Sequence, residues 1–189
     1  MVIYSMSGLV VGAAGARLLR SVPRGASVHW LWCAVPTGMS WCVTGVLDVP
    51  PRWLPVPLLV AWLGVLLSVV DFRHRRLPDL LTLPAYPLVG ALLWVCGADL
   101  GRALAGGVAY FGLHWAVHVV SPASMGGGDV KLSGPLGAVL GSVSWWGLPA
   151  GAVLASAITL AVALGRPRDG PPHGPGLVGA TWVVSLAGG

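Results

Sequence analysis

The chain has 189 residues, of which 56% are hydrophobic and 9% charged, and its mean hydropathy is +0.81. Soluble domains carry roughly 25% charged residues, whereas this sequence has no Glu, Gln or Asn and a single lysine with which to cover a water-exposed surface. The composition excludes an ordinary soluble domain and predicts an all-α integral membrane protein, a polytopic helical bundle in which residues 1–189 form one membrane domain.

Apolar runs between charges and Pro/Gly breaks predict eight membrane-spanning helices, because a helix needs about 20 mostly apolar residues to cross a bilayer. In chain order they cover residues 2–19, 27–47, 53–70, 80–98, 103–120, 131–145, 147–164 and 175–188. The sixth and eighth segments are short and could be tilted or only partly embedded. The first segment has no basic residue before Arg17 and so lacks the basic start of a secretory signal peptide, and we expect it to be retained.

The basic residues predict how these helices are oriented. With the N-terminus outside, nine of the eleven Lys and Arg residues lie on the cytoplasmic side, and only Arg52 and Arg102 lie outside. This is the bias of the positive-inside rule, and it accounts for the net charge of +5 without a nucleic-acid partner. The nine are Arg17, Arg20, Arg24, Arg73, Arg75, Arg76, Lys131, Arg166 and Arg168.

Residues that commonly bind metals do not form a recognisable site in the sequence. Cys33, Cys42 and Cys96 lie inside apolar runs and form no C-x-x-C pair, so neither zinc nor a disulfide framework is indicated. His114 and His118 are four residues apart and share a helix face, a spacing that can bind metal. Their predicted span contains no carboxylate, which favours buried polar contacts. We predict no metal and no cofactor.

Two cytoplasmic connections carry the residues with the clearest chemistry. Asp71 closes the third span in V-V-D-F-R-H-R-R-L-P-D, and Asp129 opens the sixth in M-G-G-G-D-V-K-L. Ionisable side chains near bilayer depth are costly and are functional candidates by default. Two carboxyls that share a proton can hydrolyse a peptide bond, the ionised one taking a proton from water while the other donates to the scissile carbonyl. We expect Gly126, Gly127 and Gly128 to allow unusual backbone dihedrals and close approach of a substrate strand.

These motifs resemble the type IV prepilin peptidase and preflagellin peptidase family of membrane GxGD aspartic peptidases. The resemblance covers about residues 53–188, and H-G-P at residues 173–175 is a third, weaker match. It implies an enzyme of a prokaryotic cytoplasmic membrane that cleaves the short basic leader of prepilin-like or pseudopilin-like proteins at the cytoplasmic face. Asp71 and Asp129 match the catalytic pair, and the supporting motif residues are Gly126, Gly128, Lys131, Pro78 and Asp79.

One departure from the family concerns its second activity. Bifunctional members carry a large cytosolic insert after the first span, often with paired C-x-x-C motifs, and also N-methylate the new terminus. Here the connection of residues 17–26 is short and has no cysteine. The resemblance therefore does not extend to methyl transfer.

Each motif residue also has a structural interpretation. Asp71 could cap a helix end or pair with one of the arginines that follow it, and Asp129 could be a helix N-cap. Asp79 lies beside Pro78 at a helix start, where Asp is electrostatically favourable, and a structural role is favoured there. Lys131 could hold Asp129 ionised, bind phospholipid or do neither.

Two other functions stay open at this point. A small transporter or proton-conducting membrane protein could use the Asp residues as relay sites, which predicts carboxyls near mid-span rather than at the boundary. A metal-dependent membrane hydrolase could combine Asp71 and Asp129 with the histidines predicted on the same side, His74 and His173.

Overall fold

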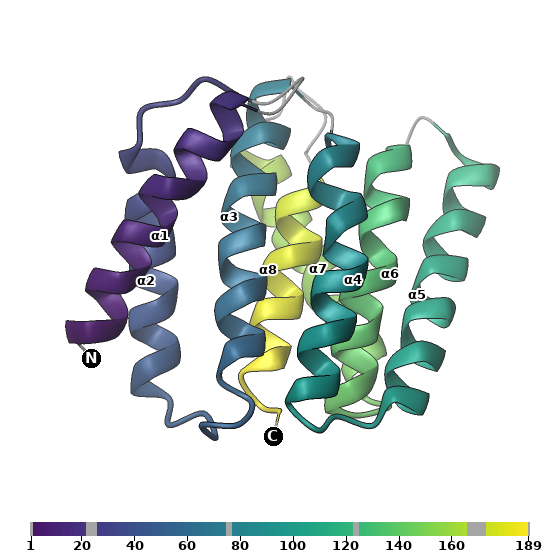
Figure 1. The fold of residues 1–189 in the computed structure, drawn as a ribbon. Coiled ribbons are helices and arrows are strands. Elements are labelled where there is room, and N and C mark those ends of the chain that lie inside the picture. Colours follow the sequence, from purple (N-terminus) through teal and green to yellow (C-terminus); the bar gives the residue numbers. More distant parts are fainter. Residues whose placement is uncertain (1, 22–25, 75–76, 123–124, 166–172, 189) are drawn as a thin grey trace.

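The computed structural model describes residues 2–21, 26–74, 77–122, 125–165 and 173–188, and in these ranges the chain forms eight α-helices and no strand. The helices are α1 (Val2–Ser21), α2 (Leu31–Val46), α3 (Pro55–His74), α4 (Asp79–Val95), α5 (Leu100–Val120), α6 (Gly127–Val143), α7 (Gly147–Gly165) and α8 (Gly174–Ser185). Successive helices run antiparallel in an up-and-down bundle (Figure 1). The all-α helical fold is confirmed, and each predicted segment coincides with one helix.

The outside of the bundle is apolar. Helices α1, α3, α5 and α7 are long and apolar enough to cross a membrane, and α4 is a shorter apolar helix. Large apolar side chains are exposed on the outer faces, among them Leu104 and Val108 on α5 and Leu160 on α7. So much exposed apolar surface is typical of a protein that faces lipid rather than water. A total of eight spans and an outward N-terminus stay predictions.

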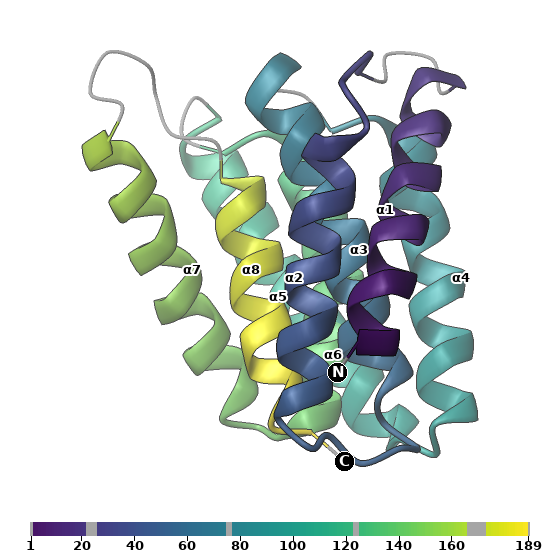
Figure 2. The same ribbon diagram turned by 90° about the vertical axis from the view of Figure 1, so that its left-hand side faces the viewer.

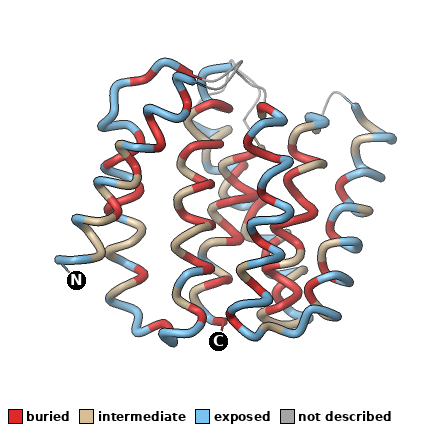
Figure 3. The backbone as a smooth tube through the Cα atoms, viewed as in Figure 1, coloured by how far each residue is buried: buried red, intermediate tan, exposed pale blue. Residues whose placement is uncertain are grey.

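The centre of the bundle is formed by α3, α6 and α8. Helix α6 is buried along most of its length, including Leu132 and Leu140, and packs against α4, α5, α7 and α8. Helix α3 packs against α8 and against the α1–α2 hairpin, which lies in front of it in Figure 2. Burial is therefore greatest on the inner helices, while α1 and α5 have exposed outer faces (Figure 3).

Glycines allow α5 and α6 to pack with their backbones in contact. A Cβ on Gly106 of α5 would lie 2.6 Å from the carbonyl oxygen of Gly137 and 2.8 Å from the Cα of Gly141, both on α6. Small residues at helix interfaces permit this approach, which supplies van der Waals contact where the hydrophobic effect is weak. Helix α6 is thus fixed against α5 along its length.

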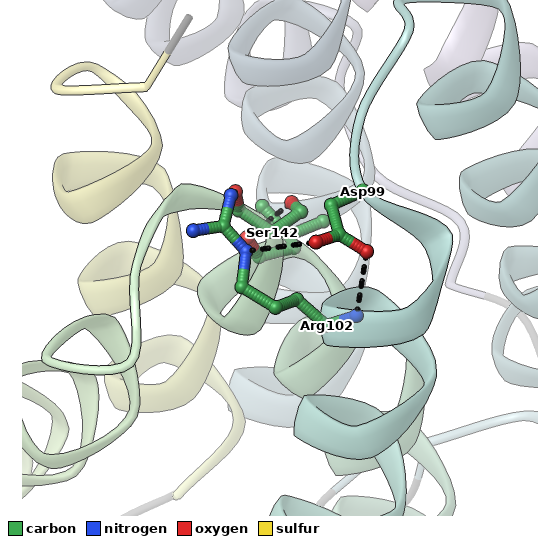
Figure 4. A network of polar contacts seen from close by, with 4 residues as sticks. Asp99, Arg102 and Ser142 are labelled. Atoms are coloured by element: carbon green, nitrogen blue, oxygen red, sulfur yellow. Dashed lines mark hydrogen bonds and ion pairs between the residues drawn. The ribbon is translucent and has the colours of Figure 1, made fainter.

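A polar network joins α5 to α6 at the end of the bundle where α5 begins (Figure 4). The Asp99 side chain caps α5 by accepting a hydrogen bond of 3.0 Å from the backbone N–H of Arg102. The Arg102 guanidinium lies 3.6 Å from the Asp99 carboxylate and donates at 3.1 Å to the carbonyl oxygen of Ser142, in the last turn of α6. A cation there satisfies a terminal carbonyl and complements the helix dipole.

The opposite end, at the top of Figure 1, is where α1, α3, α5 and α7 end and α2, α4, α6 and α8 begin; we call it the basic end. The described basic residues predicted on the cytoplasmic side lie in the terminal turns at this end: Arg17, Arg20, Arg73 and Lys131. Arg24, Arg75, Arg76, Arg166 and Arg168 lie outside the described residues. The described basic residues that the sequence predicts on the cytoplasmic side therefore all lie at the same end of the bundle.

Candidate active site

Asp71 and Asp129 lie on two different central helices at the basic end. Asp71 is in the last turns of α3 and Asp129 in the first turn of α6. Both side chains are buried, with exposed fractions of 6% and 8%. Buried carboxyls are rare because removing the charge from water is costly, so two of them at one end of the bundle define a candidate site.

Gly174, the first residue of α8, lies beside both carboxyls. Its backbone N–H donates to Asp71 Oδ2 at 3.2 Å. A Cβ on Gly174 would lie 2.8 Å from Asp71 Oδ2 and 3.6 Å from Asp129 Oδ1. The ends of α3, α6 and α8 therefore converge, and one oxygen of each carboxyl lies within 4 Å of a single point beside Gly174. Only glycine leaves that point unoccupied by a side chain of α8.

The two carboxyls differ in their hydrogen bonding. The Asp129 carboxylate accepts a hydrogen bond from the Gly126 backbone and is close enough to Asp71 to experience its charge. Among the described residues, nothing hydrogen-bonds to Asp129 Oδ1, although this atom is buried. Burial and a neighbouring like charge both oppose ionising the two carboxyls together. An unsatisfied buried oxygen beside a second carboxyl is suited to bind a water molecule or a peptide group.

The start of α6 shows how Asp129 is held. The N-cap residue is Gly126, so Asp129 is the third residue of the helix and not its N-cap, contrary to the structural alternative above. The bond from the Gly126 backbone back to the Asp129 carboxylate is one half of a capping box. The capping interaction at the start of α6 thus orients the Asp129 side chain, which lies near Asp71.

The expectation of unusual dihedrals in the glycine run is wrong. Gly126 has φ −71° and ψ 144°, and among described residues a positive φ occurs only at Gly97 and Asp48. Gly128 instead leaves space for Leu77, because a Cβ on Gly128 would lie 2.8 Å from the Cβ of Leu77. Leu77 can therefore pack onto the first turn of α6, close to Asp129.

Lys131 pairs with Asp79 rather than with Asp129. Its Nζ donates to Asp79 Oδ1 at 2.7 Å and joins the start of α6 to the start of α4, where Pro78 is the N-cap residue. The Tyr86 hydroxyl strengthens the same junction by donating at 2.7 Å to the Lys131 carbonyl oxygen. Both charged side chains are about half exposed, and their geometry favours a structural role for each.

Breaking this ion pair should have a small effect. In Asp79→Asn or Lys131→Met, we expect a stability loss of about 0–1 kcal/mol, as for other exposed pairs. Thermal unfolding in detergent measures this loss. A loss of several kcal/mol would show that the pair holds the starts of α4 and α6 together more strongly than an exposed pair does.

His114 and His118 each have a backbone partner. His114 Nδ1 lies 2.8 Å from the carbonyl oxygen of Tyr110, whose ring it also contacts, and His118 Nδ1 lies 2.8 Å from the carbonyl oxygen of Met125. His173, the N-cap residue of α8, is close enough to act electrostatically on His114. His74, by contrast, is exposed at the end of α3. Within the described part of the chain, no three His, Cys, Asp or Glu residues are grouped as metal ligands.

The fold and the site together define a helical membrane protein with a buried pair of carboxyls at one end of its bundle. Residues 58–164 match the model of the Type IV leader peptidase family. Because the match covers more than half of the chain, the protein belongs to this family. The matched range contains both Asp71 and Asp129 and ends before α8, so Gly174 lies outside it.

Several curated proteins are similar to the chain. The prepilin leader peptidase/N-methyltransferase of Aeromonas hydrophila is 31% identical over 193 residues, covering 85% of this chain and 65% of that protein. The protein of the same name from Dickeya chrysanthemi is 35% identical over 150 residues, covering 74% and 51%. The chain thus spans about half to two thirds of the length of these relatives. No solved structure gives a significant match.

Proposed function

We propose that the protein is a membrane aspartic endopeptidase that cleaves the short basic leader of prepilin-like proteins at the cytoplasmic face of the cytoplasmic membrane. The observation that carries this proposal is the convergence of the Asp71 and Asp129 carboxyls beside Gly174 in a member of the Type IV leader peptidase family. The predicted orientation, with the basic end inside, supports the cytoplasmic location.

In the proposed reaction the pair holds one proton. The ionised carboxyl takes a proton from a water molecule, whose oxygen attacks the scissile carbonyl carbon, while the protonated carboxyl donates to the carbonyl oxygen. The C–N bond then breaks as the leaving amine takes a proton from the pair. The new carboxyl group forms when a hydroxyl of the intermediate returns a proton to the pair, which again holds one proton. The Gly174 N–H holds Asp71 Oδ2 in place throughout. The proton belongs to the pair and is not assigned to either residue.

The substrate would bring a basic leader and an apolar helix to this site. The helix would enter from the bilayer, and the leader would lie at the basic end near the carboxyls. Asp79 is already paired with Lys131. Among the described aspartates at this end, we propose that the two buried carboxyls contact the leader side of the cleaved bond.

This mechanism uses carboxyls alone, so chelation should not affect it. We expect the purified protein, reconstituted with a prepilin-like substrate, to produce one new N-terminus at the same rate with and without EDTA. Mass spectrometry of the product identifies the bond that is cut. If EDTA abolishes cleavage and a divalent ion restores it, the metal-dependent hydrolase is the correct alternative.

A further inference from the structure

A cavity with two arginines in its lining lies on the α1–α2 hairpin, outside the matched family range. It has a volume of about 390 Å³ and is lined by Ala13, Ala16, Arg17, Arg20 and Trp30. Small-molecule sites typically occupy roughly 300–1,000 Å³. The four α1 residues are spaced i, i+3, i+4 and i+7, so they form one face of the helix near its C-terminal end.

The two arginines give this cavity its chemistry. The Arg20 guanidinium donates to the Val28 carbonyl oxygen at 2.9 Å, which anchors it beside the segment that leads to α2. Among the described residues, neither Arg17 nor Arg20 forms an ion pair with an acidic side chain. Guanidinium groups bind phosphate oxygens through paired N–H donors, so two of them at one cavity are suited to a phosphate group.

The other lining residues favour a lipid as the source of such a phosphate group. Helix α1 is long and apolar enough to cross a membrane, and the arginines occupy its last two turns, where a span would reach the membrane surface. Ala13 and Ala16 extend the lining toward the middle of α1, so the part of the lining away from the arginines is apolar. Trp30 is about half exposed on the opposite wall, and Trp is enriched at the membrane–water interface.

We propose that the cavity of Ala13, Ala16, Arg17, Arg20 and Trp30 binds the phosphate headgroup of an anionic phospholipid from the cytoplasmic leaflet. Anionic lipids are attracted to basic groups at that surface. The bound lipid would stabilise the α1–α2 hairpin and its packing on α3, where Gly15 of α1 contacts Leu66 and Trp62. This inference does not depend on the proposed peptidase activity.

The test compares lipid binding to the full chain in detergent for Arg17→Gln and Arg52→Gln. Each variant removes one positive charge, but Arg52 lies at the other end of the bundle, between α2 and α3. Native mass spectrometry and thermal unfolding are measured with phosphatidylglycerol, phosphatidylcholine or inorganic phosphate. We expect phosphatidylglycerol to bind and stabilise the wild type, with binding about tenfold weaker in Arg17→Gln and unchanged in Arg52→Gln.

Two outcomes would overturn the inference. Equal phosphatidylglycerol binding by Arg17→Gln and the wild type excludes the cavity as the site, and equal stabilisation by inorganic phosphate makes it a soluble-anion site. Arg17→Lys provides a second variant that keeps the charge and loses the paired donors. We expect its binding to be intermediate.

Discussion

Leader cleavage is expected to be lost when either Asp71 or Asp129 is replaced by Asn. Asn preserves the size of the side chain but can neither accept the proton from water nor donate an acidic proton. Loss of a general acid or base typically costs about 10²–10⁴-fold in rate. Because the two carboxyls act as a unit, the double variant should be no slower than either single one. The measurement is processing of a co-expressed prepilin-like protein, followed by the mobility shift of its mature form.

Asp79→Asn is the matched control, since it makes the same chemical change on an exposed aspartate at the same end of the bundle. Its processing should resemble that of the wild type. If Asp71→Asn and Asp129→Asn both leave processing intact, the carboxyl pair is not catalytic. If the protein shows no proteolysis but conducts ions in proteoliposomes, and Asp71→Asn removes that flux, the transporter interpretation replaces the peptidase.

Gly174→Ala is expected to lower cleavage about 10²-fold, the effect of misplacing a reacting group by about 1 Å. The added Cβ would lie 2.8 Å from Asp71 Oδ2, too close to be accommodated without a shift, and 3.6 Å from Asp129 Oδ1. The backbone N–H is retained, so the loss would report displacement of the carboxyl and occupation of the space between the pair. Initial rates on a purified substrate, compared at equal amounts of folded protein, measure the effect.

Other glycines separate this effect from helix packing. On the same helix, a Cβ on Gly179 would meet Ile158 Cδ1 at 3.5 Å, an ordinary contact, and Gly179→Ala should cleave normally. A Cβ on Gly176 would collide with Thr159 of α7, so Gly176→Ala should lower thermal stability. Equal rates for Gly174→Ala and Gly179→Ala would remove Gly174 from the site, even if both Asp→Asn variants were inactive.

The sequence predicted the helices because they depend on local information, namely the length of apolar runs and the position of charges. The same information placed Asp71 and Asp129 at helix ends on one side, and both lie buried at one end of the bundle. Their catalytic role stays a prediction.

The sequence did not predict the position of Gly174 beside both carboxyls, which requires α8 to pack against both α3 and α6. The partner of Lys131 was left open for a similar reason, since Asp79 lies 52 residues away along the chain. The predicted start of the sixth helix, residue 131, was late. Helix α6 begins at Gly127 and includes Asp129 in its first turn, because a charged residue is compatible with a helix start although it interrupts an apolar run.

The burial of α6 also bears on how the chain is inserted into the bilayer during synthesis. By length and composition α6 is neither a candidate span nor one of the shorter apolar helices, and it carries Asp129, Lys131 and Ser133 in its first half. A translocon that selects segments by hydrophobicity would retain such a helix poorly when it arrives alone. Helix α5 precedes it, is apolar enough to span, and meets it through glycines. We infer that α5 and α6 enter the bilayer as a hairpin, so that Asp129 reaches its buried position because the neighbouring helix is hydrophobic enough to insert.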